Sequence, residues 1–309
     1  MNGSVAYLTG GTGFIGLHLS RLLIDEGWHV VALHRPGADV EALSALGVDL
    51  AEGDLNNAAS VLNTVPDTPD AIFHVAGNVS FDSAGDAAQV ADNVDGTRNL
   101  LAAARARHCR RFVYTSTGAT FGLHDGWVTE DTPSNAMEVP INYFRTKTLA
   151  ENAVLDAATD GLDVIILNPA NVVGPGDRVI WTPFVRAIKS GALTGVGPGA
   201  GSFCHIDEVV RAHLAAYERG QRGQRYILAG DVARFVDLAA MVARLTDGHA
   251  PPVTDTPPEG MSPETFELMS HVQMLDCSKA ERELGFRPVR VSVMFNDLVT
   301  WLQQKDLAG

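Results

Sequence analysis

Apolar residues in the first half of the chain form short runs that alternate with stretches of helical spacing. The runs are rich in Val, Ile and Leu, as in strands covered on both faces, whereas the stretches repeat apolar residues at three and four positions. We expect strands at residues 5–8, 29–34, 48–52, 71–77, 111–115 and 163–167, and helices at 14–24, 41–46, 90–107 and 143–158. Because consecutive parallel strands need a crossover helix, this alternation predicts an α/β fold with a doubly wound parallel sheet.

The alternation becomes irregular after residue 170, where prolines and glycines interrupt it. In this part we expect helices at 182–190, 207–219, 235–245 and 293–303, a strand at 225–228, a glycine-rich connection through Gly201 and a proline-rich loop at 251–263. The pattern predicts a doubly wound domain at residues 1–170 and a smaller, mainly substrate-binding lobe at 171–309. Some segments of the lobe are expected to return to the main sheet.

Composition narrows the class of protein. The chain has 309 residues and a formal net charge of −14, which argues against nucleic acid or an anionic membrane as a partner. Its three cysteines are scattered, which favours free thiols in a reducing compartment over disulfides or zinc. Since no signal peptide precedes the first strand and no apolar run reaches transmembrane length, we expect a cytoplasmic protein. The ten histidines form no close group with carboxylates or cysteines, so we expect no metal site.

Three glycines, Gly10, Gly13 and Gly16, connect the strand at 5–8 to the helix at 14–24. Glycines at this spacing allow a tight turn, a close approach of the backbone to a pyrophosphate, and close packing of helix on strand. Free N–H groups at the helix N-terminus would face the phosphates. The context of strand, turn and helix predicts the dinucleotide site of a Rossmann fold.

The second strand ends in His34 and Arg35, where many dinucleotide-binding proteins carry an acidic residue that accepts from the ribose. An arginine there fits a 2′-phosphate, so we expect NADP(H), with NAD(H) as the alternative. Arg35 could also be a solvated surface side chain. Asp54 could accept from the adenine amino group or cap the following helix.

A second group of polar residues follows the strand at 111–115, where Thr115, Ser116 and Thr117 are consecutive. Farther along, Tyr143 and Lys147 are four positions apart and therefore share one face of a helix. An ammonium group beside a phenol favours the phenolate, so we expect Lys147 to lower the pKa of Tyr143 toward values useful for acid–base work.

Together these motifs resemble those of the extended short-chain dehydrogenases/reductases, which include nucleotide-sugar epimerases, dehydratases and dihydroflavonol reductases. The resemblance is carried by residues 9–16, 53–55, 74–77, 93–97, 115–117, 143, 147, 168–169 and 174–176. It implies that Tyr143 is the general acid–base, that Lys147 holds the nicotinamide ribose, and that Thr117, or alternatively Ser116, orients the substrate oxygen. Asn93 matches a position that in this family usually supports the central helices near the active site, and the resemblance leaves a structural and a catalytic role equally open.

The resemblance also implies a set of cofactor contacts and a homodimer. The homodimer would pair the helices at 90–107 and 143–158 with their counterparts in a second subunit. The expected cofactor contacts are Gly10, Thr12, Gly13, Phe14, Ile15, Gly16, His34, Arg35, Asp54, Leu55, Val75, Ala76, Gly77, Thr115, Tyr143, Lys147, Asn168 and Pro169.

Three functions are consistent with this pattern. Arg35 favours an NADP(H)-dependent oxidoreductase that reduces a carbonyl of a small organic substrate, similar to dihydroflavonol reductases, because nucleotide-sugar epimerases typically carry Asp after the second strand. The alternative is a nucleotide-sugar epimerase or dehydratase with tightly bound NAD. A non-catalytic dinucleotide sensor is the third, although such relatives commonly lose the Tyr and Lys pair.

Substrate contacts in the lobe have two interpretations each. Aromatic and apolar side chains could line a pocket or form the core; they are Phe81, Met137, Trp181, Phe184 and Phe203. Arg178, Arg186 and His205 could meet an acidic group of the substrate or be solvated or capping side chains. Asp207 is expected to cap the helix at 207–219.

Overall fold

The centre of the molecule is a seven-stranded parallel sheet with the strand order β10-β7-β5-β4-β1-β2-β3. The structure, a computed structural model, describes residues 3–80 and 85–308. The strands are β1 (Val5–Thr9), β2 (His29–His34), β3 (Asp49–Glu52), β4 (Ala71–His74), β5 (Arg111–Thr115), β7 (Val164–Pro169) and β10 (Arg225–Leu228). The predicted doubly wound parallel sheet is therefore confirmed.

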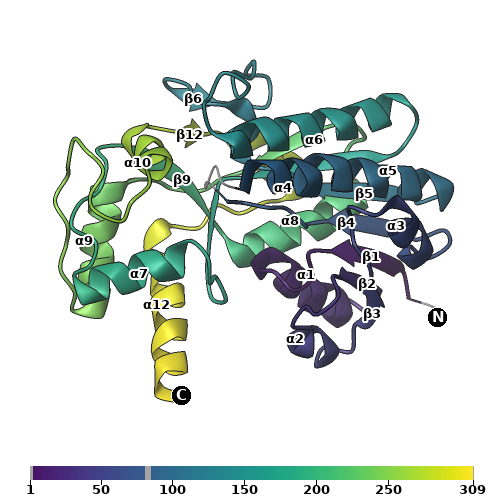
Figure 1. Cartoon of the computed structure of the whole chain (residues 1–309), viewed down its shortest axis with the longest axis horizontal. Helices are drawn as coiled ribbons and strands as arrows, with labels where there is room; N and C mark the ends of the chain where they lie inside the picture. The colour runs from purple at the N-terminus through teal and green to yellow at the C-terminus, as the bar shows by residue number, and fades with distance from the viewer. Residues whose placement is uncertain (1–2, 81–84, 309) are drawn as a thin grey trace.

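Helices cover both faces of the sheet (Figure 1). On one face lie α3 (Ala58–Thr64), α4 (Asp86–Val90), α5 (Gly96–Ala106) and α6 (Asn142–Thr159), and on the other α1 (Phe14–Asp25), α8 (Ile206–Arg219) and α11 (Ser278–Leu284), with α2 (Glu41–Ser44) beside α1. Successive strand residues alternate between the two cores, since Tyr7 packs under α3 and α5 whereas Leu8 packs under α1 and α8. Helices α5 and α6 lie side by side on one face of the sheet.

The lobe is built on a second sheet with the strand order β11-β9-β8. Its elements are β8 (Asn171–Val173), α7 (Trp181–Ser190), β9 (Ala200–His205), β11 (Val232–Arg234), α9 (Phe235–Thr246), α10 (Pro263–Ser270) and α12 (Val291–Ala308). A small two-stranded sheet pairs β6 (Trp127–Val128) with β12 (Met274–Leu275). Two elements that lie among those of the lobe in the sequence belong to the main domain. Helix α8 packs against the main sheet, and β10 is a strand of that sheet and pairs with β7.

Several predicted elements differ from the observed ones. The helix expected at 90–107 begins earlier as α4, passes through the π-helical segment Ala91–Asp95 and continues as α5. The end of the expected glycine-rich connection is strand β9, in which Gly201 lies against Asn171 of the neighbouring strand. Helix α12 is longer than the expected 293–303, and α10, α11, β6, β8, β11 and β12 were not predicted.

The three cysteines are free and buried, in agreement with the sequence. Cys109 packs under α5, and Cys204 and Cys277 belong to the core beneath α8. Among the helices of the described residues, none combines the length and the apolar character that a membrane span needs.

Phe203 packs against several aromatic rings in the core of the lobe. Its ring is fully buried and lies within 5.2 Å of the ring of Trp181 and within 6.1 Å of that of Phe295, measured between centroids. We expect Phe203→Ala to lower the free energy of unfolding by about 3–5 kcal/mol in urea denaturation, because it leaves a cavity among aromatic rings. Leu307→Ala is the control, since Leu307 is 89% exposed. A loss for Phe203→Ala as small as that of the control would contradict this packing.

Candidate active site

The glycine turn between β1 and α1 has the shape of a phosphate cradle. Gly10 has a φ of +74°, and a Cβ there would lie 2.6 Å from the backbone nitrogen of Ala76. A Cβ on Gly16 would collide with the carbonyl of Gly10. Gly13 is the N-cap of α1 and supplies no side-chain cap, which leaves the first-turn N–H groups for another acceptor. The turn therefore fits a dinucleotide pyrophosphate.

The loop after β4 connects this cradle to the other end of the site. Ala76 N donates to Thr9 Oγ1 at 3.2 Å, so the loop is fastened to the end of β1. A Cβ on Gly77 would lie 3.8 Å from Lys147 Nζ and 3.6 Å from Asn93 Oδ1. The backbone thus passes from the glycine turn to Lys147 through small residues, which leaves the carboxyl edge of the sheet open to an elongated ligand.

Asn93 fixes the position of that loop. Its Oδ1 accepts from Asn78 N at 2.7 Å, and its Nδ2 donates to Asn78 O at 3.0 Å and to Thr146 Oγ1 at 3.1 Å. The buried amide therefore ties the β4 loop to α6, next to Lys147. Its observed contacts are those of a supporting residue.

Tyr143 lies in the first turn of α6 with its ring against apolar side chains. Tyr143 packs against the buried cluster of Ala136, Ile141 and Phe144, and the partly buried Leu123, Val139 and Leu268 pack against the same cluster. Burial raises the pKa of Tyr143, and a hydrogen bond with the side chain of Thr117 opposes this increase. The expected lowering of the pKa of Tyr143 is therefore wrong for this arrangement, because desolvation of the phenolate is the largest effect.

Lys147 is buried one turn farther along α6. Its Nζ donates to Tyr114 Oη and to Thr115 O, each at 2.9 Å. Burial lowers the pKa of Lys147 to about 8, and the nearby carboxylate of Glu151 opposes the change. The ammonium is thus held at the end of β5, where the sequence placed it, but Tyr114 was not predicted as its partner.

Glu151 forms a buried polar hub below Lys147. It accepts from Ser116 Oγ at 2.5 Å and from Thr120 Oγ1 at 3.1 Å. Asn168 Nδ2 donates to the same carboxylate at 2.7 Å and to Thr117 O at 3.1 Å. The Ser116 hydroxyl is therefore committed to Glu151, whereas Thr117 faces Tyr143. Sequence reasoning missed Glu151, although its position four residues after Lys147 placed it on the same face of the helix.

Arg35 lies at the opposite end of the site. Its Nη2 donates to Asp92 Oδ1 at 3.0 Å, and its side chain is 63% exposed. His34 Nδ1 lies 3.1 Å from the carbonyl oxygen of Arg35. Asp54 Oδ1 accepts from Asn56 N at 3.0 Å, which forms a turn within its own loop.

The cap of α3 is Asn57, whose side chain accepts from Ser60 N at 3.0 Å. The interpretation of Asp54 as the cap of this helix is therefore wrong, because the capping residue Asn57 comes three residues after Asp54. Likewise, α8 begins at Ile206 and is capped by His205, whose Nδ1 accepts from Asp207 N at 3.2 Å. Asp207 lies inside the first turn, so its prediction as the cap was also wrong.

The expected apolar wall of the lobe is largely core. Trp181 and Phe203 are buried with the rings of the lobe, and Phe184 packs against them. Met137 is 50% exposed, and Phe81 lies outside the described residues. The interpretation of Trp181 and Phe203 as pocket walls is therefore wrong.

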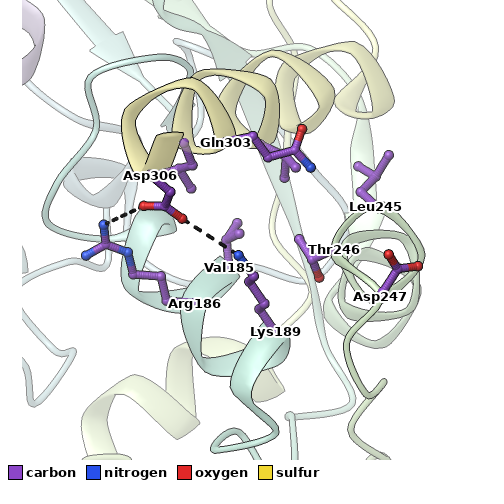
Figure 2. A pocket seen from close by; sticks show the side chains of 10 residues that line it. Val185, Arg186, Lys189, Leu245, Thr246, Asp247, Gln303 and Asp306 are labelled. Carbon is purple, nitrogen blue, oxygen red and sulfur yellow. Dashed lines mark ion pairs between the residues drawn. The ribbon is translucent and has the colours of Figure 1, made fainter. Parts of the chain in front are cut away.

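Figure 2 shows a pocket between α7, α9 and α12. Arg186 and Lys189 on α7 both point toward Asp306 on α12, with nitrogen–oxygen distances of 3.9 and 3.7 Å. Arg178, which precedes α7, is exposed. The residues lining this pocket include none of the predicted catalytic or cofactor residues.

A parallel sheet that places a nucleotide cradle and a Tyr–Lys pair along one carboxyl edge defines the class of protein. It is an NAD(P)-dependent enzyme of the short-chain dehydrogenase/reductase type.

Comparison with known proteins agrees with this class. The model of the NAD dependent epimerase/dehydratase family matches residues 6–229, and the chain belongs to this family. It is 31% identical to sterol demethylase protein B of Methylococcus capsulatus, with 97% of this chain and 98% of the relative covered. It is also 31% identical to a putative dihydroflavonol 4-reductase of Synechocystis sp., covering 96% and 94%. The solved structure of gox2253 superposes with a TM-score of 0.88 at 27% identity, covering 98% of both chains.

Direct titration of Lys147 tests the electrostatics of the site. The sequence contains four lysines, so NMR of ¹³C-labelled lysine side chains should give few signals. We expect one signal to titrate with a pKa of about 8 and to be absent from Lys147→Met. Between that pH and the ordinary lysine pKa the unfolded chain binds a proton that the folded protein lacks, so this group favours folding as the pH rises. A signal for Lys147 that titrates near 10.5 would contradict the burial described here.

Proposed function

We propose that the protein is an NADP(H)-dependent oxidoreductase that reduces a carbonyl group of a small, largely apolar organic substrate. The observation that carries the proposal is the hydrogen bond between Tyr143 and Thr117 beside the buried ammonium of Lys147. These three side chains meet at the carboxyl edge of the sheet that also bears the glycine cradle. Because they share one edge, a single extended cofactor can reach both the glycine cradle and these three side chains.

A nicotinamide cofactor held along this edge would supply the hydride for the carbonyl carbon. Tyr143 donates its phenolic proton to the carbonyl oxygen, so that the alcohol forms without a free alkoxide. Thr117 donates a hydrogen bond to the same oxygen while negative charge develops on it. Lys147 is charged at neutral pH because its pKa is about 8, and we propose that it holds the nicotinamide ribose. The hydrogen bond with Thr117 stabilises the tyrosinate that remains until a proton returns from solvent.

The proposed preference for NADP(H) rests on Arg35. Its side chain is exposed at the end of β2 and carries the planar group that suits a phosphate. The residues proposed to hold the rest of the cofactor are those predicted from the sequence, from Gly10 to Pro169. The similarity to a putative dihydroflavonol 4-reductase supports reduction as the reaction.

The surroundings of Tyr143 support an apolar substrate. Tyr143 packs against the same small apolar cluster as Leu123, Val139 and Leu268, the last contributed by α10 of the lobe. We propose that the lobe at 171–309, apart from α8, β10 and α11, which belong to the main domain, binds the substrate. We also propose a cytoplasmic homodimer paired through α5 and α6, which sedimentation analysis would test.

An epimerase or dehydratase of nucleotide-linked sugars is the second candidate, favoured by the family's own description. In that reaction the cofactor is reduced and reoxidised within one turnover, so no net NADPH is consumed. NAD that copurifies with the protein, together with turnover of a nucleotide sugar, would favour this candidate.

Replacing Tyr143 by phenylalanine removes the proton donor and should lower kcat for ketone reduction by about 10²–10⁴-fold. The measurement is NADPH oxidation at 340 nm with a ketone that the wild-type protein reduces, accompanied by product analysis. We expect one NADPH consumed per alcohol formed. NADPH affinity, followed by fluorescence, is the control and should change little. Undiminished reduction by Tyr143→Phe would exclude the proposed role.

Thr117 and Ser116 can be separated by matched substitutions. Thr117→Ala should lower kcat by about 10- to 100-fold through loss of a donor to the reacting oxygen, and Thr117→Ser should restore most of the activity. Ser116→Ala should instead cost about 1–3 kcal/mol in the free energy of unfolding, because Glu151 loses a buried donor. A larger kinetic loss for Ser116→Ala than for Thr117→Ala would reverse the assignment.

A further inference from the structure

Asp92 connects three loops at the carboxyl edge of the sheet. It lies in the π-helical segment between α4 and α5, and its side chain is only 14% exposed. Its carboxylate accepts from Arg35 Nη2 at 3.0 Å, from Asn56 Nδ2 at 3.1 Å and from Asn78 Nδ2 at 3.1 Å. These donors follow β2, β3 and β4, so one carboxylate holds three successive strand ends together.

Arg35 is only partly used by this contact. A guanidinium presents five N–H donors, and the described residues accept from Arg35 only through Asp92 and only at Nη2. The remaining donors are available to a phosphate, which binds arginine through paired hydrogen bonds. A phosphate on Arg35 would therefore lie close to the negative charge of Asp92.

We propose that Asp92 is a specificity-determining residue that orients Arg35 and at the same time limits the preference of the enzyme for a 2′-phosphate. The inference rests on the proposed NADP(H) site. The ion pair holds the guanidinium at the mouth of the adenosine site, which favours binding of the phosphate. Repulsion between the Asp92 carboxylate and the phosphate weakens that binding, so the enzyme also retains use of NAD(H).

The test compares two ligands that differ only in the 2′-phosphate, 2′,5′-ADP and 5′-AMP, by isothermal titration calorimetry. Asp92→Asn removes the charge but keeps an acceptor oxygen for Arg35. We expect it to tighten 2′,5′-ADP by about fivefold to tenfold and to leave 5′-AMP within about twofold, and the gain should shrink at high salt. The ratio of kcat/KM with NADPH to that with NADH should rise in parallel.

The matched control is Asp95→Asn. Asp95 lies in the same segment, is exposed and pairs with Arg98 at 3.6 Å, so the variant removes an equal charge without touching Arg35. Its ligand ratio should equal that of the wild-type protein. If Asp92→Asn does not fold, Asp92→Gln also removes the charge and keeps an acceptor oxygen for Arg35, and a shift of the ratio in the same direction is expected.

The outcomes distinguish this inference from the proposed function. An unchanged or lower ratio in the Asp92 variants, or an equal loss of affinity for both ligands, would overturn the role of Asp92. Arg35→Ala should weaken 2′,5′-ADP selectively. If it leaves the ratio unchanged, the NADP(H) proposal itself fails, whatever the Asp92 variants do.

Discussion

The buried positive charge of Lys147 is the constraint on which the site depends. An ammonium in a protein interior is costly unless hydrogen bonds and an opposite charge compensate it. Here Tyr114 and Thr115 accept its hydrogen bonds, and the carboxylate of Glu151 lies one helical turn away. Because Glu151 is itself buried, it requires donors of its own, and Ser116 supplies one of them. One buried charge thus requires polar partners on several neighbouring elements.

The π-helical segment between α4 and α5 sets the directions of two adjacent polar side chains. A π turn accommodates an extra residue and is frequent at functional sites. In this segment the adjacent residues Asp92 and Asn93 both contact Asn78, but Asp92 also reaches Arg35 at the end of β2 and Asn93 also reaches Thr146 on α6. The segment therefore joins the loop after β2, which carries Arg35, to the part of α6 that carries Lys147. The sequence predicted one continuous helix over 90–107, because the pattern of apolar residues does not reveal the single inserted residue of a π turn.

Local signals in the sequence predicted what depends on local geometry. The strand, glycine turn and helix around Gly10 and the pair Tyr143 and Lys147 follow from short spacings, and the structure brings both groups to one edge of the sheet. Contacts between distant residues were not visible, which is why Tyr114, Glu151 and Asp92 were missed. Strand β9 was read as the end of a loop because Gly201 is a poor strand former, yet its missing side chain is what allows Asn171 to approach.

The lobe is positioned by the same strand that completes the site. Strand β7 ends at Pro169, and after one residue the chain enters β8 of the lobe, so the direction of β7 sets where the lobe begins. The loop after β8 returns to the dinucleotide domain, where the carbonyl oxygen of Pro175 lies 2.8 Å from Nε2 of His18 on α1. Asn168, at the end of β7, also donates to the carbonyl of Thr117. The strand that orders Thr117 thus also orients the lobe, so the position of the lobe relative to Tyr143 does not depend on a flexible linker.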